Sequence, residues 1–490
     1  MTGSLSGAIR GHAESTPDAI ALVHGDETVT YGRLYRRATR FAESLAGNPD
    51  SPIGLLAPKT PDGIALVLGC LLARRPFVLP SLTLAERTRA ELFRKAGCAA
   101  VVSPDDFPAA DAQVDAAADT ARRHDRMPRP DARTFHLTTS GSTGLPKVVP
   151  LTEGAVDRFT DWAGTRFDLG PDSTVLNYSP LNFDLCLLDI WATLKHGGRV
   201  VLVDPERATN ARHLAGLLHR HRVTVLQAVP MPFQLLAGGT DTFPELRHVI
   251  VTGDALPAPT LAALPTLFPA AQLYNLYGCT ETNDSMLHRF ERDALPAGRA
   301  PLGEPIHGVS VVVVDDTGAV VDRGGTGELY VSTPFQTTGY LDETLNPGRF
   351  VPHPTGADDR PYYRTGDLVE VDPDGRLTLI GRTDFQVKVR GVRTDLGEID
   401  RVLTAHTDVA EAVTIAVPDP VAGNRLHAIS RRRPGSGLTG LELRRYLADR
   451  LPRTAIPATL QLTDDDLPRT STGKPDRQHL LHTLTQKETQ

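Results

Sequence analysis

The segment Leu137-Thr-Thr-Ser-Gly-Ser-Thr-Gly-Leu-Pro-Lys147 gives the strongest indication of both architecture and chemistry in this 490-residue sequence. A strand-like run leads into a loop of glycines and hydroxyl residues that ends in a lysine. Glycines let backbone N–H groups approach an anion closely, and hydroxyls add further donors. The spacing differs from the P-loop pattern, in which Gly-Lys is followed by Ser or Thr. The segment predicts a polyphosphate loop of another kind, and the alternative is a flexible Ser/Gly loop.

Around this segment, from about Ile53 to Gly278, short apolar runs alternate with segments of helical spacing. The runs are Phe77–Leu79, Ala100–Ser103, Val175–Tyr178, Arg199–Val203, Val223–Val229, His248–Thr252 and Gln272–Leu276. Alternating β and α elements predict parallel sheets covered by helices, which is an α/β fold. Nearer the N-terminus, Ala21–Val23 and Thr28–Tyr31 flank a Gly-Asp turn and predict a hairpin.

The pattern changes after Gly303. Short strand-like runs, Val309–Val314, Gly327–Ser332 and Leu377–Ile380, are separated by Gly and Asp turns and predict a smaller antiparallel unit or barrel. A compact α+β piece is expected beyond Gly391. Because single hydrophobic cores stop growing near ~250–300 residues, a chain of 490 residues should form at least two domains.

Composition excludes several classes of protein. A net charge of −7 argues against a nucleic-acid binder, which would carry a basic stripe. No apolar run approaches the ~20 residues that span a bilayer, and the N-terminus lacks the pattern of a signal peptide. The four cysteines, Cys70, Cys98, Cys186 and Cys279, form no CxxC pair, so neither a zinc site nor a disulfide framework is expected. A reduced, cytoplasmic setting fits these observations.

Four further segments follow the first one in the chain: Tyr274-Asn-Leu-Tyr-Gly-Cys-Thr-Glu281, Tyr363-Arg-Thr-Gly-Asp367, Gly381-Arg-Thr-Asp-Phe-Gln-Val-Lys-Val-Arg-Gly391 and Pro468-Arg-Thr-Ser-Thr-Gly-Lys-Pro-Asp-Arg477. Taken in this order, the five segments resemble the signatures of the adenylate-forming superfamily. That superfamily contains acyl-CoA synthetases, luciferases and the adenylation domains of non-ribosomal peptide synthetases. The resemblance extends over nearly the whole chain.

The resemblance implies a division into two domains. Residues 1–383 would form the N-terminal adenylation core, with ATP and acid pockets and a β-rich subdomain at about 301–383. Residues 384–490 would form a small mobile α+β domain that follows a hinge at Asp384. This domain would rotate after adenylation and bring the Lys388–Gly391 face to a thiol tunnel, because a few residues at an element end can absorb such a rotation.

The resemblance also implies an ATP site that uses Mg²⁺. Glu281 is a hard oxygen ligand suited to Mg²⁺, and Thr280 would donate to the α-phosphate. Asp367 would accept the ribose hydroxyls with support from Arg382. Tyr277 would stack on adenine and Asn275 would read its amino group. The remaining ATP-binding residues would be Thr139, Ser140, Gly141, Ser142, Thr143, Gly144, Lys147, Gly253, Asp254 and Ala255.

Lys474 is the residue expected to carry the adenylation step. By the resemblance, its ammonium bridges the substrate carboxylate and the phosphate, where it stabilises charge on both partners. The alternative is a solvated surface lysine. Only seven of the 52 basic residues are lysines, so a lysine in the Thr-Gly-Lys-Pro context is unusual in this chain.

The segment Phe183-Asp-Leu-Cys-Leu-Leu-Asp-Ile-Trp191 resembles the beginning of the acid pocket in adenylation domains. Asp184 falls where amino-acid-activating members place a carboxylate for the substrate ammonium, and its alternative role is a helix cap. A buried carboxylate is costly unless it is paired, so an ammonium partner is a reasonable explanation. The matching pocket residues are Asp184, Leu185, Leu188, Gln227, Ile250, Thr252, Leu276, Asp284 and Ser285.

The pocket indicates the kind of acid. Its Asp-Leu-Leu opening is similar to that of free-standing prolyl-activating members, but Gln227, Thr252, Asp284 and Ser285 are more polar than a proline pocket needs. The hypothesis is a small, cyclic or β-amino acid, with a polar or cationic side chain among the options. Asp284 either meets a second amine or points to solvent.

The acceptor is expected to be the phosphopantetheine thiol of a separate carrier protein, in non-ribosomal peptide or antibiotic biosynthesis. No carrier-domain serine motif follows Lys474, so the enzyme is expected to act in trans or to derive from a longer protein. An acyl- or aryl-CoA synthetase that uses free CoA is the alternative enzyme. The alternative from another class is a non-catalytic nucleotide-binding scaffold, against which the presence of Lys147, Glu281, Asp367 and Lys474 argues.

Overall fold

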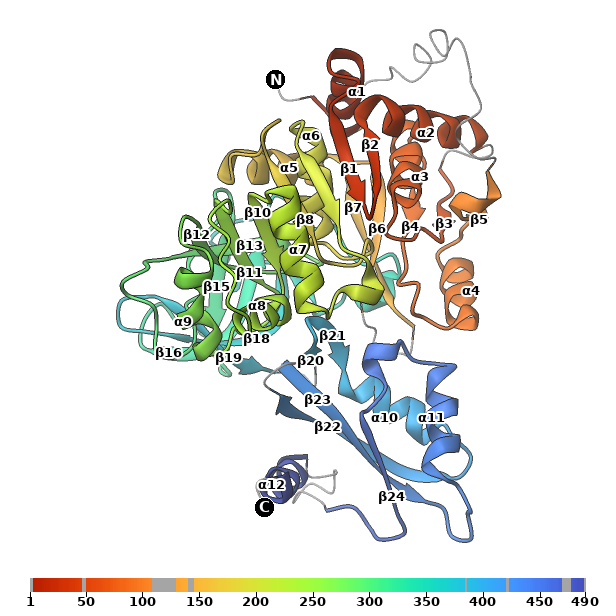
Figure 1. Ribbon diagram of the computed structural model, residues 1–490. Helices are drawn as coiled ribbons and strands as arrows, with labels where there is room; N and C mark the ends of the chain where they lie inside the picture. Colours follow the sequence, from red (N-terminus) through yellow and green to blue (C-terminus); the bar gives the residue numbers. More distant parts are fainter. Residues whose placement is uncertain are drawn as a thin grey trace.

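The computed structural model describes residues 3–45, 50–107, 129–139, 145–383, 386–419, 423–468 and 477–488. A large N-terminal part contains two mixed sheets with helices and a separate antiparallel sheet, and a smaller α+β part lies below it (Figure 1). This arrangement confirms the predicted α/β class with a large N-terminal and a small C-terminal domain. None of the helices in the described ranges is long and apolar enough to cross a membrane.

The largest sheet has nine strands. In spatial order they are β14 (Glu304–Pro305), β13 (Asn283–Phe290), β12 (Gln272–Cys279), β11 (His248–Thr252), β10 (Val225–Ala228), β8 (Thr174–Asn177), β9 (Arg199–Leu202), β1 (Ile20–His24) and β2 (Glu27–Thr30). Neighbours from β12 to β1 are parallel, and β2, β13 and β14 add antiparallel edges. Both faces of the parallel strands are covered, which explains their nearly continuous apolar runs.

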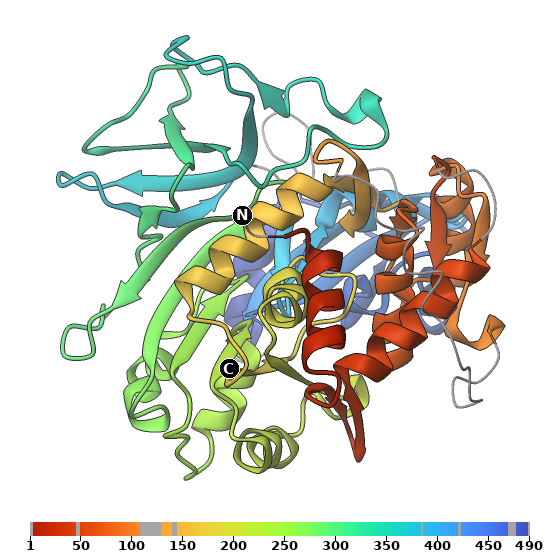
Figure 2. The ribbon, with the colours of Figure 1, turned by 90° about the horizontal axis from the view of Figure 1, so that it is seen from above.

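Two hydrophobic clusters cover the faces of this sheet. On one face lie helices α7 (Ala211–His221), α8 (Pro230–Ala237) and α9 (Ala258–Leu267), which pack on strands β8 to β12. On the other face lie helices α1 (Leu5–Ser15), α3 (Pro61–Leu72) and α5 (Glu153–Arg166). Figure 2 shows α1 and α5 lying beside each other. The α/β alternation of the sequence therefore produces the expected helix-covered sheet.

The second sheet holds the phosphate-loop segment. Its strands are β5 (Ala100–Val102), β3 (Ile53–Leu55), β4 (Phe77–Val78), β6 (Arg133–Thr139) and β7 (Lys147–Thr152), and helices α2 (Tyr31–Ser44) and α4 (Glu86–Lys95) lie near it. Strand β6 is the expected strand before the loop, and Lys147 begins β7 opposite Thr139. The predicted loop residues Ser140, Gly141, Ser142, Thr143 and Gly144 lie outside the described residues.

The antiparallel unit predicted after Gly303 is confirmed. Its strands are β15 (Ser310–Val314), β16 (Gly325–Ser332), β18 (Tyr362–Val371), β17 (Phe350–Val351) and β19 (Leu377–Arg382), and all of their pairings are antiparallel. Figure 2 places this sheet to one side of the helix-covered sheets. Strands β18 and β19 carry Asp367 and Arg382 from this unit.

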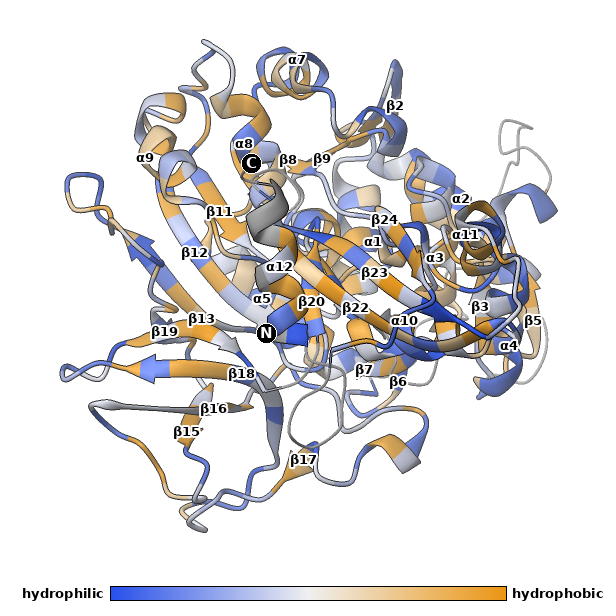
Figure 3. Cartoon of the chain, turned by 90° about the horizontal axis from the view of Figure 1, so that it is seen from below, coloured by the Kyte–Doolittle hydropathy of each residue, from blue (hydrophilic) through white to orange (hydrophobic). Residues whose placement is uncertain are grey.

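The C-terminal part starts with the hairpin β20 (Gln386–Val389) and β21 (Val392–Asp395). A three-stranded sheet follows, with strands β22 (Val409–Asp419), β23 (Gly423–Arg432) and β24 (Thr459–Thr463). Helices α10 (Leu396–Thr404) and α11 (Gly440–Ala448) pack on one face, and Leu480 of α12 (Arg477–Glu488) packs on the other. Figure 3 shows hydrophobic residues along β22 and β23, which lie between these helices. The predicted hinge residue Asp384 lies outside the described residues.

Several strands were not predicted, and β13 is the one that bears on the acid pocket. The run Asn-Asp-Ser-Met-Leu-His-Arg-Phe forms β13 and pairs with β12. Its first residues are polar and strand-poor, so local propensity gave no strand signal. The strand forms because the buried edge of β12 requires backbone partners. It matters for function because it carries Asp284 and Ser285 to the end of β12.

Candidate active site

The candidate residues gather at the carboxyl ends of strands β10, β11 and β12. In open α/β sheets this edge is where ligands bind. The β20–β21 hairpin reaches the same edge. A Cβ built on Gly391 would lie 2.3 Å from Cγ1 of Val229, which follows β10, and Gly391 has a φ of +78°. Only glycine allows both this approach and this backbone angle.

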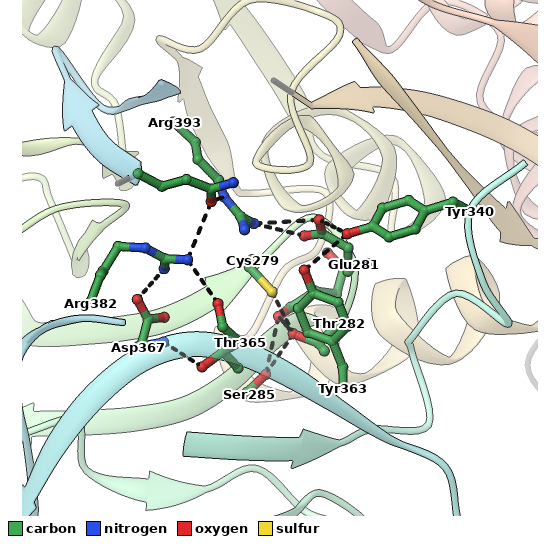
Figure 4. A network of polar contacts seen from close by, with 12 residues as sticks. Cys279, Glu281, Thr282, Ser285, Tyr340, Tyr363, Thr365, Asp367, Arg382 and Arg393 are labelled. Carbon is green, nitrogen blue, oxygen red and sulfur yellow. Dashed lines mark hydrogen bonds and ion pairs between the residues drawn. The ribbon is translucent and has the colours of Figure 1, made fainter. Parts of the chain in front are cut away.

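Glu281 is the centre of a buried polar cluster that follows β12 (Figure 4). Its side chain is fully buried, and the Tyr340 hydroxyl donates to its Oε1 at 2.7 Å. The Tyr363 hydroxyl lies 3.0 Å from that of Tyr340. Arg393 of β21 donates to both carboxylate oxygens, at 3.4 and 3.1 Å. The hairpin of the C-terminal part is therefore joined directly to this carboxylate.

The electrostatics keep Glu281 ionised. Burial alone would raise its pKa, but Arg393, the Tyr340 hydroxyl and Lys147 together lower the pKa to about 2. A buried ionised carboxylate is a suitable hard ligand for Mg²⁺, which typically takes one or two carboxylates together with substrate phosphates. Within the described ranges, no group of three His, Cys, Asp or Glu side chains could hold a metal without such help. Glu281 therefore fits a site in which Mg²⁺ would be bound by this carboxylate together with the phosphates of the substrate.

Lys147 lies beside the same cluster. Its Nζ is 5.1 Å from the centre of the Tyr340 ring, and 7% of the residue is exposed. Burial lowers the pKa of Lys147, whereas the negative charge of Glu281 raises it. Opposite it on β6, the hydroxyl of Thr139 is buried without a hydrogen-bond partner. Within the described part of the chain, both groups are available to an anion.

The predicted ribose residues Asp367 and Arg382 are in contact. Arg382 forms an ion pair with Asp367 and donates to the Thr365 carbonyl at 2.9 Å (Figure 4). The Tyr277 hydroxyl donates to the other oxygen of Asp367 at 2.5 Å, which fixes the ring beside that carboxylate. The three side chains come from β12, β18 and β19, so strands of two different sheets form this part of the candidate ribose site.

The predicted adenine residues lie at the ends of β11 and β12. Asn275 donates from Nδ2 to the Pro301 carbonyl at 2.7 Å. Gly253, directly after β11, has a φ of +82° and is followed by Asp254, whose carboxylate accepts the N–H of Ala255 at 2.8 Å. These contacts hold the backbone of Gly253–Ala255, which is predicted to bind ATP, in a defined turn.

The predicted acid pocket lies between the π-helical turn Leu187–Ala192 and β10 to β13. Asp184 accepts the N–H of Leu185 at 3.0 Å, and its carboxylate lies near the Thr280 hydroxyl. Gln227 donates to the Leu185 carbonyl at 3.2 Å. Burial raises the pKa of Asp184 despite the hydrogen bonds that it accepts. Asp184 therefore lies beside Thr280, whose neighbour Glu281 belongs to the candidate phosphate site.

The remaining pocket residues form buried walls. Leu188, Ile250 and Leu276 belong to the main hydrophobic core, and Thr252 is 4% exposed. The Ser285 hydroxyl contacts the Asn283 carbonyl and the Thr282 hydroxyl within its own turn. Asp284 is the second residue of β13 and lies opposite Gly278 of β12. The structure thus brings the predicted pocket residues to one region, although Lys474 lies outside the described residues.

Sequence reasoning missed several residues of this region. Arg393 and Tyr340, which both contact Glu281, were not singled out. Asp189 was also missed: it is fully buried, accepts from Asn177 at 3.1 Å and lies near Lys59, which donates to the Tyr178 carbonyl at 2.9 Å. Of these residues, only Arg393 could have been found from the sequence, because it lies two residues after the turn at Gly391.

Solved structures show the class of fold. The adenylation domain AlmE of Vibrio cholerae, solved with glycyl-adenosine-5'-phosphate, has a TM-score of 0.83 and 22% identity, and the match covers 98% of this chain and 97% of that one. The amide bond synthetase McbA of Marinactinospora thermotolerans has a TM-score of 0.84 and 23% identity, covering 98% and 99% of the two chains. The fold is therefore that of adenylate-forming enzymes.

Sequence relatives define the family. The family model described as AMP-binding enzyme matches residues 9–341, and that of the AMP-binding enzyme C-terminal domain matches residues 398–474. An L-proline–[L-prolyl-carrier protein] ligase of Streptomyces coelicolor is 34% identical over 93% of this chain and 92% of its own length. A linear gramicidin synthase of Brevibacillus parabrevis is 33% identical over 95% of this chain but only 9% of its own length. The chain belongs to the AMP-binding enzyme family, as the motifs indicated.

A buried carboxyl near the interdomain contact predicts a pH-dependent stability. Glu398 of α10 is 7% exposed, and burial together with Asp395 raises its pKa to about 8. In the unfolded chain this carboxyl ionises near pH 4.5, so stability should fall as pH rises from about 4.5 to about 8. Thermal unfolding of Glu398→Gln should show a smaller loss of Tm over this range than the natural protein. The exposed Glu370→Gln variant is the control, and equal slopes for all three proteins would contradict the prediction.

Proposed function

We propose that this enzyme activates an amino acid with ATP and transfers the aminoacyl group to the phosphopantetheine thiol of a carrier protein. In the first step a carboxylate oxygen attacks the α-phosphorus, the bond to the pyrophosphate oxygen breaks, and an aminoacyl-AMP forms. The observation that carries this proposal is that the carboxylate of Asp184, where the substrate ammonium would bind, lies near Thr280 and Glu281. An ammonium site and a candidate triphosphate site are thereby held side by side.

The proposed nucleotide site combines the residues described above. Asp367 would accept the ribose hydroxyls with Arg382 beside it, and Asn275 and the Gly253–Ala255 turn would face adenine. Lys147, Thr139 and the segment 140–144 would hold the phosphates, and Thr280 would donate to the α-phosphate. When bound at Glu281, Mg²⁺ would neutralise charge that develops on the leaving pyrophosphate. Such transfers are catalysed mainly by positioning and electrostatics, which this group of residues can supply.

The second step needs the C-terminal domain, which we propose begins at residue 384. The thiol sulfur attacks the acyl carbon, a thioester forms, and AMP leaves with the bonding electron pair. Rotation about Asp384 would exchange Lys474 for the β20–β21 hairpin. Support for this comes from the contacts of the hairpin with the strand ends, through Gly391 at Val229 and Arg393 at Glu281.

A carrier protein is the acceptor that the relatives favour. The ligase of Streptomyces coelicolor is named for a carrier protein, and a structure related at 22% identity is an artificial fusion of an adenylation domain and a carrier domain, NpsA-ThdA of Klebsiella oxytoca. A CoA synthetase of an acyl or aryl acid is the second candidate. Asp184 argues against it, because a simple acid would leave this carboxylate without a cation.

The test is exchange of labelled pyrophosphate into ATP with Mg²⁺, measured with proteinogenic, cyclic and β-amino acids and with simple carboxylic acids. Exchange that depends on one amino acid or a narrow group of them is expected. Exchange with simple acids alone would contradict the role of Asp184 and favour the CoA synthetase. Thioester formation is then measured with holo-carrier protein and with CoA, and loading of CoA alone would contradict the proposed acceptor.

A further inference from the structure

The acid pocket contains a second carboxylate, Asp284, that has no protein partner. Among the described residues, no hydrogen bond or ion pair engages its side chain. Burial raises its pKa strongly, and the neighbouring charges of Asp184 and Asp189 raise it further. Asp284 differs in this from Asp184, which accepts the N–H of Leu185, and from Asp189, which accepts from Asn177.

Unpaired buried acceptors lie around the same carboxylates. The Oε1 atom of Gln227 has no hydrogen-bond partner although the residue is 1% exposed. Its Nε2 is bound to Leu185, so the amide group is held against the turn that carries Asp184. The Oδ1 atom of Asp189, which is fully buried, also lacks a partner. Buried polar atoms are normally hydrogen-bonded, so these atoms indicate donors that a ligand brings.

The described cations near the pocket have other contacts. Lys59 donates to the Tyr178 carbonyl and lies near Asp189, where it opposes the rise of that pKa. Lys388 lies near both Asp184 and Asp254 and does not act on Asp284. The pocket therefore has three carboxylates and an amide oxygen in a region with few donors. Asp284 is half-buried, so an occupant with a single ammonium would satisfy Asp184 but would shield the carboxylate of Asp284 from water without compensating its charge, which is unfavourable.

We propose that the amino acid activated by this enzyme carries a second cationic nitrogen in its side chain. The α-ammonium binds Asp184 and the side-chain ammonium binds Asp284, with Gln227 as a further acceptor. An ammonium has three donors and no acceptor, which matches a site made only of acceptors. The apolar walls formed by Leu188, Ile250 and Leu276 suit the methylene groups between the two nitrogens. This inference rests on the proposed amino acid activation and narrows its substrate to diamino acids.

Pyrophosphate exchange with matched pairs of amino acids tests this inference. The pairs are 2,3-diaminopropionate and 2-aminobutyrate, 2,4-diaminobutyrate and norvaline, ornithine and norleucine, and lysine and 2-aminoheptanoate, in which a terminal methyl replaces the amine. One diamino acid should exceed its partner in kcat/KM by about 10²-fold, because a site built to bind a polar group rejects the analogue that lacks it. A preference for the apolar member of every pair, or for proline, would overturn the inference.

Variants separate this inference from the proposed function. Asp284→Asn should remove the preference for the diamino acid, because it lowers kcat/KM for the diamino acid and raises kcat/KM for the apolar partner, whose binding no longer leaves a charge uncompensated. Asp284→Glu keeps the charge and should shift the preference to a diamino acid one methylene shorter. The exposed Asp293→Asn variant is the control, and its preference should equal that of the natural protein. An unchanged preference in Asp284→Asn overturns the inference while the function stands, whereas no exchange with any amino acid overturns the proposed function itself.

Discussion

Replacing Lys474 by alanine should lower amino-acid-dependent pyrophosphate exchange by about 10²–10³-fold, because loss of one preorganised charge at a transition state has effects of this size. The attacking carboxylate and the triphosphate are both anions, so their approach requires a cation between them. Lys147 and Arg393, the described cations nearest Glu281, already neutralise that carboxylate. An additional cation is therefore needed for the substrate, and Lys474 is our candidate.

The measurement compares initial exchange rates at saturating ATP and amino acid. Thermal unfolding of Lys474→Ala should match that of the natural protein, and the exposed Lys95→Ala variant should retain full exchange. Transfer from synthetic aminoacyl-AMP to the carrier should be far less affected, because adenylation is bypassed. A folded Lys474→Ala protein with nearly normal exchange would show that another group bridges the two anions.

Replacing Asp184 by asparagine should lower kcat/KM for the amino acid by about 10²-fold or more, since breaking a buried charge pair costs about 2–5 kcal/mol. Asparagine has nearly the same volume and can still accept the N–H of Leu185. The change therefore removes the charge with little effect on packing. The KM for ATP should stay within about threefold, because Asp184 belongs to the acid pocket.

Steady-state exchange with each substrate varied in turn provides this test. The exposed Asp172→Asn variant is the matched control. The natural enzyme should also discriminate against the deamino analogue of its substrate, and Asp184→Asn should lose that discrimination. Equal kcat/KM in the variant and the natural enzyme would mean that the carboxylate only holds the local turn.

Local sequence patterns predicted much of the fold. The apolar runs of β8 to β12 are long enough to indicate parallel strands, and the Leu137–Lys147 segment indicated β6. Strand β13 was missed because Asn283, Asp284 and Ser285 have no strand preference of their own. Tertiary pairing with β12 overrides that preference.

The candidate site was predictable only where motifs carried it. Asp367 and Arg382 were predicted from two separate sequence segments. In the structure they form an ion pair, as expected for two residues of the same candidate ribose site. Arg393 and Glu281 lie 112 positions apart in the sequence. Hydrophobic periodicity predicts local elements only, so it could not predict their contact. The unpaired state of Asp284 depends on the burial of neighbouring residues, so it becomes visible only in three dimensions.

The ion pair of Arg393 with Glu281 has a consequence for the order of product release. The guanidinium of Arg393 and a divalent ion would draw on the same two oxygens of Glu281, so docking of the hairpin would weaken binding of metal-bound pyrophosphate at this carboxylate. With Glu281 as the metal ligand, release of pyrophosphate would favour docking of the hairpin and access of the thiol. AMP would then be released only in the second half-reaction, after pyrophosphate. Glu281 would thus favour the start of the second half-reaction only after the first has released its pyrophosphate.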